Sequence, residues 1–194
     1  MFRKLNGLLW LRVQVLISNS TLLATLLMPF GATVLYNALL NKNGELSLFL
    51  LSASLTMVLS MGSGYMVSIM MAEDKEKRNL KSLLLSGVTA TEYTFSMLVL
   101  PMLIMLLGMI LLPIYLKVDV SGYLFAYVIY LVLATICIIF LNLLIGAVSD
   151  TQSKAQVYSI FPMLIVSFLP IIALQNDTVQ KVLDYSFVGP IVNL

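Results

Sequence analysis

Residues 73–92 read EDKEKRNLKSLLLSGVTATE, and this charged segment interrupts a chain that is otherwise mostly apolar. It contains eight of the chain's 20 charged residues in about a tenth of its length. Long apolar runs lie on both sides of it. Ionised side chains are costly in hydrocarbon, so the stretch predicts a water-facing segment between two membrane spans.

The charged half of this stretch has the spacing of a helix. Glu73 and Lys77, like Asp74 and Arg78, stand four residues apart with the acid first. Each such pair stabilises a helix by roughly 0.2–0.5 kcal/mol. We therefore expect one water-facing helix over 73–87. Its apolar stripe consists of Leu80, Leu83 and Leu84.

The end of this helix and the start of the next are both marked in the sequence. Gly87 suits the position after a helix C-terminus, where a positive φ is common. Thr89 and Glu92 have the spacing of a capping box, and Val88 and Tyr93 that of a hydrophobic staple. The sequence predicts a helix, a stop, and a restart into the next span.

The composition places the whole chain in a membrane. Of its 194 residues, 60% are hydrophobic and 10% are charged, and the mean hydropathy is +1.02. Soluble domains are about 25% charged. We expect an all-α, polytopic bundle of membrane helices in a single domain over 1–194. Five apolar runs reach the roughly 20 residues that a spanning helix needs, and they cover 21–40, 47–72, 93–116, 122–148 and 156–174.

The same composition excludes several function classes. The net charge of +2 gives no electrostatic basis for binding nucleic acid. The chain has no histidine, which removes the usual zinc ligands and the histidine-containing metalloprotease motifs. Cys137 is the single cysteine, so no disulfide forms within the chain. We expect no metal site and no catalytic centre in this chain.

Residues 1–19 predict an amphipathic helix that lies along the membrane surface. Trp10 suits the headgroup level, and Arg12 stands at the edge of the apolar face, where its stem can snorkel to water. With the N-terminus in the cytoplasm, eight lysines and arginines face the inside and three face the outside, as the positive-inside rule requires. This topology leaves 175–194 outside, as an extracellular or re-entrant segment.

The predicted spans contain no aspartate, glutamate, lysine or arginine in their middle parts. Such a charge costs about 2.5–3.5 kcal/mol on insertion scales and usually marks a path for ions or protons. Its absence indicates that the chain does not couple transport to an ion gradient by itself.

The second span carries a small residue at every fourth position. Small side chains at this spacing let membrane helices approach closely. Packing within the chain's own bundle is the more common use of such a stripe, and a sliding or subunit-contact surface is the alternative. The small-residue stripe consists of Ser52, Thr56, Ser60, Gly64 and Ser68.

Polar side chains in the fourth span are further candidates for packing or translocation. Tyr123, Tyr127 and Tyr130 share one face near one end of it, where tyrosines commonly form an aromatic belt at the membrane interface. The alternative is that they line the path of an amphipathic substrate. Asn142 lies deeper in the span, where an interhelical hydrogen bond is the usual role of an asparagine.

The stretch 73–92 resembles the cytoplasmic coupling helix of permeases in the type-2 ATP-binding-cassette (ABC) exporter family. In those permeases an acidic and lysine-rich segment between spans two and three precedes a leucine run, a short break and a restart with a glutamate. The family often has glycine where this chain has Arg78, and normally has six spans where five are found here. The matching residues are Glu73-Asp74-Lys75-Glu76-Lys77, Leu80, Leu83-Leu84-Leu85, Ser86-Gly87-Val88 and Glu92.

The resemblance implies partners that supply the energy. A coupling helix of this family docks on a separate ATPase subunit, two copies of which bind and hydrolyse ATP with Mg²⁺. This chain has no GxxxxGK[ST] phosphate loop, so it cannot hold ATP itself. A second permease, another copy or a paralogue, completes such a transporter. The residues implied to contact the ATPase are Glu73, Glu76, Lys77, Leu80, Lys81, Leu83 and Leu84.

Two functions from different classes are consistent with the sequence. The first is a permease that exports a peptide, drug or lipid across the cytoplasmic membrane. The second is a non-transporting immunity, sensor or scaffold subunit that sequesters a toxic peptide. An ATPase that copurifies through the leucines of the coupling segment favours the first.

Overall fold

The computed structural model describes residues 2–41, 44–173, 178–179 and 181, and the regular structure in these residues is helical. The expected all-α architecture is therefore confirmed. The predicted extracellular or re-entrant segment, 175–194, lies almost entirely outside the described residues.

The first half of the chain forms a surface helix and two long helical runs. α1 (Phe2–Ser18) corresponds to the predicted amphipathic helix, and α2 (Ser20–Leu40) to the first span. The second span is a continuous helical run in three parts, α3 (Ser47–Met57), the π-helix η1 (Val58–Tyr65) and α4 (Met66–Glu76).

The second half begins with a short helix and continues with three long ones. α5 (Asn79–Leu85) precedes α6 (Ala90–Leu116). The single-turn 3-10 helix η2 (Ser121–Tyr123) leads into α7 (Leu124–Val148), and α8 (Gln152–Ala173) follows.

Four helices in the described residues are long and apolar enough to cross a membrane, and they coincide with the first four predicted spans. These helices are Ser20–Leu40, Ser47–Glu76, Ala90–Leu116 and Ser121–Val148. α8 is a helix of 22 residues where the fifth span is expected. Its role as a fifth span stays a prediction.

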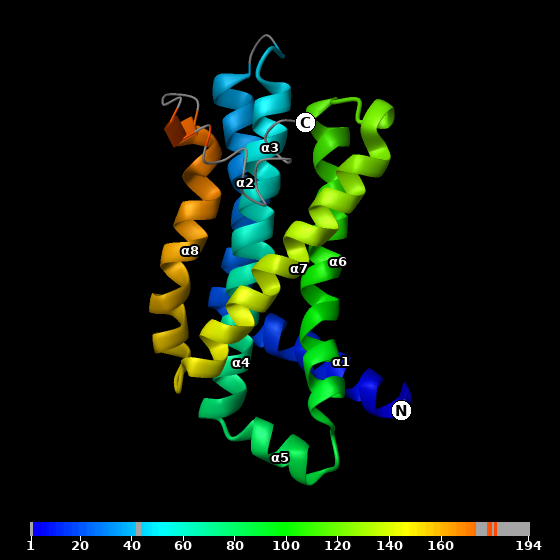
Figure 1. The fold of residues 1–194 in the computed structure, drawn as a ribbon, viewed down its shortest axis with the longest axis vertical. Coiled ribbons are helices and arrows are strands. Elements are labelled where there is room, and N and C mark those ends of the chain that lie inside the picture. The colour runs from blue at the N-terminus through cyan, green and yellow to red at the C-terminus, as the bar shows by residue number, and fades with distance from the viewer. Residues whose placement is uncertain (1, 42–43, 174–177, 180, 182–194) are drawn as a thin grey trace.

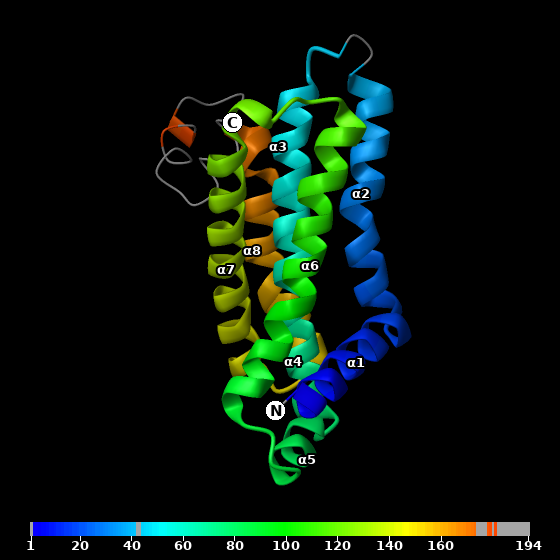
Figure 2. The same ribbon diagram turned by 90° about the vertical axis from the view of Figure 1, so that its right-hand side faces the viewer.

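The helix of the second span lies at the centre of the bundle. In its membrane-length window 89% of the residues are buried, against 17–44% in the other three candidate spans. α2, α6, α7 and α8 surround it, and α1 crosses the bundle obliquely near one end (Figure 1, Figure 2). α5 lies at that same end, which we call the α5 end. The α2–α3 and α6–α7 connections lie at the opposite end.

The π-helix η1 interrupts the central helix where two glycines contact neighbouring helices. A Cβ added at Gly62 would lie 3.3 Å from Ile104 of α6, and one at Gly64 only 2.7 Å from Asn142 of α7. The missing side chains therefore let α6 and α7 approach closely. The π-helix was not predicted, because a local change of hydrogen bonding from i+4 to i+5 leaves no mark in the hydropathy pattern.

Candidate functional site

The charged stretch 73–92 does not form the single helix expected over 73–87. The central helix continues through Glu73 and Asp74 and ends at Glu76. Arg78 then takes a left-handed conformation with a φ of 58°, and α5 begins at the next residue. The prediction was wrong because Glu73 and Asp74 are only 4% and 1% exposed. They belong to the bundle, and the chain turns only after them.

Asp74 lies at the centre of a buried polar cluster that joins three helices. Its Oδ2 accepts a hydrogen bond from Arg12 Nη1 of α1 at 2.5 Å and another from the Tyr93 hydroxyl of α6 at 3.0 Å. The guanidinium of Arg12 lies 5.0 Å from the centroid of the Tyr93 ring. The side chains of Arg12 and Asp74 are each 1% exposed. Each charge depends on the other, because an unpaired buried charge is strongly destabilising.

Two sequence predictions about these residues were wrong. Asp74 does not pair with Arg78, since its carboxylate is buried with Arg12 while Arg78 is exposed. Arg12 does not snorkel to water, because Asp74 and Tyr93 provide buried partners for its guanidinium. The spacing of residues along one helix does not reveal which partner a distant segment supplies.

Glu73 is buried beside this cluster and links α4 to the start of α2. Its Oε2 accepts a hydrogen bond from Asn19 Nδ2 at 3.1 Å, and its Oε1 forms an ion pair with Lys77 at 2.6 Å. The predicted i,i+4 pair of Glu73 and Lys77 is therefore confirmed. The hydrogen bond to Glu73 raises the pKa of Lys77, whose side chain is 61% exposed.

Lys75 and Glu76 bind the turn between α7 and α8. Lys75 Nζ donates to the carbonyls of Ala147 and Ser149 at the C-terminus of α7, each at 2.6 Å. Glu76 Oε2 accepts from the backbone N–H of Gln152, the first residue of α8, at 2.7 Å. The cation thus meets the negative end of one helix dipole, and the anion meets the positive end of the other.

The stop after α5 and the restart of α6 confirm the prediction made from the sequence. Gly87 has a φ of 80°. The N–H groups of Gly87 and Val88 bond to the carbonyls of Leu84 and Leu83, respectively, which is a Schellman motif. The predicted capping box over 89–92 is present at the start of α6. Both signals involve residues that are close together in the chain, so they can be recognised from the sequence alone.

The residues that the resemblance implied as ATPase contacts differ widely in exposure. Glu73 is buried, and Leu80 and Leu83 are half-buried against the core of the chain's own bundle. The remaining members of the set are exposed, namely Glu76, Lys77, Lys81 and Leu84. The docking role of this set stays a prediction.

A compact exposed surface nevertheless remains at the α5 end. Leu84 and Leu85 are 52% and 80% exposed, and the exposed cations Lys77, Arg78 and Lys81 precede them. We call these five residues the α5 surface. It combines an apolar contact with positive charge, which suits a partner groove that is apolar and bordered by acidic groups.

The small-residue stripe of the second span lies inside the bundle, where all of its members are buried. Ser60 and Ser68 hydrogen bond to Ser167 and Ser159 of α8, with 2.6 Å between the hydroxyl oxygens of each pair. The residue number increases by eight from Ser60 to Ser68 on the central helix and decreases by eight from Ser167 to Ser159 on α8. The two bonds therefore set the antiparallel register of α8 on the central helix. The stripe members are Ser52, Thr56, Ser60, Gly64 and Ser68.

The three tyrosines of the fourth span occupy different environments. Tyr127 is 1% exposed, and its hydroxyl donates to the Met109 carbonyl of α6 at 3.1 Å. Tyr130 is 44% exposed, and Tyr123 is half-buried in η2. Tyr127 is therefore a buried contact between α6 and α7.

Asn142 is buried but does not form the expected interhelical hydrogen bond. Its Nδ2 donates to the Ile138 carbonyl of its own helix at 2.9 Å, and its Oδ1 has no partner among the described residues. Gly64 of the central helix lies directly against this side chain. The asparagine thus contributes close packing at η1 without a polar bond across the helices.

Arg12, Lys75 and Tyr93 bind the helices together at the α5 end, and sequence reasoning did not assign these roles. A signal existed for Arg12, because a lone arginine at the edge of an apolar helix face can pair with an acidic residue at the end of a span. The sequence carries no such signal for Lys75 or Tyr93, whose partners lie on distant segments.

Comparisons with known proteins place the chain in a family. Neither the curated proteins nor the solved structures gave a match. A family model described as ABC-2 family transporter protein matches residues 15–186. The match covers most of the chain, including the four candidate spans and α5. This multi-pass membrane protein therefore belongs to the ABC-2 transporter family, as a permease component of a transporter.

Proposed function

We propose that this chain is the permease subunit of an ABC exporter that moves a hydrophobic or amphipathic substrate, such as a peptide, drug or lipid, across the cytoplasmic membrane. Two permeases, copies or paralogues, would combine with two copies of a separate ATPase that binds ATP and Mg²⁺. The N-terminus and α5 would face the cytoplasm. The family match and the distribution of lysine and arginine support this arrangement.

The observation that carries the proposal is the attachment of the α5 connection to several helices. Lys4 of α1 donates to the Gly87 carbonyl after α5 at 2.9 Å, and Asp74 joins α4 to α1 and α6. Lys75 and Glu76 join α4 to α7 and α8. A partner that displaces α5 would therefore displace the ends of most helices in the bundle.

The α5 surface would be the part that docks. Leu84 and Leu85 would enter an apolar groove of the ATPase, and Lys77, Arg78 and Lys81 would orient the contact through charge. Leu80 and Leu83 would instead attach α5 to the permease, since both pack against its core. The two nucleotide states of the ATPase must favour different permease arrangements, because only a difference in affinity shifts an equilibrium.

Copurification tests this proposal. The tagged full-length chain is purified from its native membrane, and bound ATPase is measured by ATP hydrolysis and mass spectrometry. Combining Leu84→Asp with Leu85→Asp should lower the bound ATPase at least tenfold. The matched control is Leu46→Asp, an exposed leucine at the opposite end of the bundle, which should retain it.

Two results would overturn the proposal. Wild-type chain without any ATPase would favour the non-transporting scaffold. An ATPase that the double variant retains would show that docking uses another surface.

A further inference from the structure

Two cavities follow one another along a single face of α6. The loop cavity, near the α6–α7 connection, has a volume of about 670 Å³, and the midspan cavity has a volume of about 440 Å³. The lining residues from α6 and its C-cap run from Phe95 to Leu103 and from Leu106 to Lys117, and successive members are one or three positions apart. This spacing keeps all of them on one side of the helix, with α7 forming the other wall.

The walls of both cavities consist of large side chains. No glycine or alanine is among the described residues that line them, and Ser121, in the loop, is the single serine. Membrane helices that pack against each other usually present small residues, as the central helix does at Gly62 and Gly64. The α6–α7 face therefore suits a flexible chain that can follow a rough surface better than it suits another helix.

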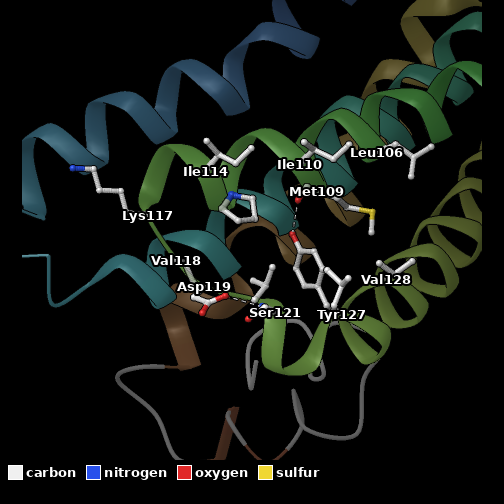
Figure 3. A pocket seen from close by; sticks show the side chains of 13 residues that line it. Leu106, Met109, Ile110, Ile114, Lys117, Val118, Asp119, Ser121, Tyr127 and Val128 are labelled. Atoms are coloured by element: carbon white, nitrogen blue, oxygen red, sulfur yellow. Dashed lines mark hydrogen bonds between the residues drawn. The ribbon is translucent and has the colours of Figure 1, made fainter.

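Two polar atoms next to Pro113 in the loop cavity are paired with each other. Pro113 lacks an N–H, so the Met109 carbonyl one turn earlier lacks its usual helical donor. The Tyr127 hydroxyl donates to that carbonyl at 3.1 Å, as Figure 3 shows. Because these two atoms satisfy each other, the part of the cavity around Pro113 is apolar.

The rim of the loop cavity carries two opposite charges. Asp119 accepts a hydrogen bond from the Ser121 N–H at 2.9 Å, and this bond keeps the pKa of Asp119 below its usual value, so the carboxylate is ionised at neutral pH. Lys117 lies two residues away and forms no ion pair with the described residues. Lys117 is exposed and is part of the cavity lining, and its side chain extends away from Asp119 and Tyr127 (Figure 3).

We propose that this face of α6 and α7 binds a phospholipid of the surrounding bilayer, with its acyl chains in the two cavities and its headgroup at the rim. The phosphate pairs with Lys117, and an ammonium headgroup such as that of phosphatidylethanolamine pairs with Asp119. The site needs a chain embedded in a bilayer, and it does not depend on which solute is exported or on which ATPase is bound.

Lipid retention tests the proposal. The full-length chain is reconstituted in vesicles of phosphatidylethanolamine and phosphatidylglycerol, extracted in detergent, and the phospholipid bound per chain is counted by native mass spectrometry. We expect wild-type chain to retain phosphatidylethanolamine. Ile110→Trp places a large ring in the loop cavity and should lower retention at least tenfold. Leu107→Trp is the matched control, since Leu107 is similarly exposed on α6 but lines neither cavity.

A change of charge at the rim tests the headgroup contact without altering the packing of α6 against α7. Lys117→Glu reverses an exposed charge at the rim and should lower retention several-fold, whereas Lys117→Arg should preserve it. Thermal unfolding in the same detergent identifies any loss of folding in Ile110→Trp. Wild-type chain that retains no phospholipid, or equal retention in all variants, would overturn the proposal.

Cross-linking tests whether a second copy of the chain covers the same face of α6 and α7. Leu106→Cys is made in a Cys137→Ser background so that it is the single thiol. Efficient disulfide formation between two copies would show that a second chain covers the loop cavity, and the lipid site would then be wrong. The expected result is a chain that forms no disulfide at this position, even where two permeases associate through another face.

Discussion

Arg12 and Asp74 lie 62 residues apart in the chain and form an ion pair in which each side chain is 1% exposed. Two further nitrogens of Arg12, Nε and Nη2, are buried without a hydrogen-bond partner in the described residues. A pair with unmet donors adds little net stability compared with apolar residues of the same size. Its effect is to restrict how α1 can sit against α4 and α6.

Removing one partner of this pair should be more harmful than removing both. Asp74→Ala leaves the Arg12 guanidinium buried and unpaired, which should lower the free energy of unfolding by about 3–5 kcal/mol. Arg12→Met combined with Asp74→Leu replaces both charges with apolar side chains and should recover most of that loss. Thermal unfolding in detergent measures both variants. A double variant as unstable as Asp74→Ala would contradict the role of the unpaired charge.

Glycine at position 78 should stabilise the turn before α5. Arg78 has a φ of 58°, a conformation that costs roughly 1–2 kcal/mol in residues with a Cβ. Arg78→Gly should slow amide hydrogen exchange over 79–85. Lys81→Gly, the same kind of change inside α5, should speed that exchange, because glycine in a helix interior costs roughly 0.5–1 kcal/mol. Equal effects of the two changes would refute the prediction.

A methyl group at Gly146 should disturb the contact between α7 and α4. A Cβ there would lie 2.9 Å from Met71 Cβ and 3.1 Å from the Ser68 carbonyl oxygen. Gly146→Ala should lower the free energy of unfolding by about 1–3 kcal/mol. Gly31→Ala is the control, since no atom lies within 4 Å of its added Cβ, and it should be neutral or slightly stabilising. Thermal unfolding of the two variants measures the difference, and equal melting temperatures would contradict the prediction.

The hydroxyl of Tyr127 should matter more than that of Tyr130. Tyr127→Phe removes the side-chain donor to the Met109 carbonyl, and Pro113 cannot supply the usual helical donor in its place. The expected loss is about 1–3 kcal/mol in the free energy of unfolding. Tyr130→Phe changes a half-exposed side chain and should stay within about 0.5 kcal/mol of wild type. An unchanged melting temperature for Tyr127→Phe would show that the bond adds nothing.

The positions of the helices were predictable because their signals are local. Hydrocarbon thickness sets the length of an apolar run, so the predicted bounds 21–40 and 93–116 differ from α2 and α6 by at most three residues. The stop at Gly87 and the capping box over 89–92 depend on neighbouring residues alone, and both are present. The stretch 73–78 was interpreted less well. Its charges could pair within one helix or with distant segments, and local spacing does not distinguish these possibilities.

A bundle of membrane helices with one charged break between the second and third spans follows from the amino-acid order alone, because apolar length and helix-end residues act over a few positions. Which charges of that break face water depends on contacts between distant segments. Glu73 and Asp74 are buried and Lys77 and Arg78 are exposed. The reason is that burial depends on what lies opposite a side chain, and Asn19, Arg12 and Tyr93 reach these residues from other helices.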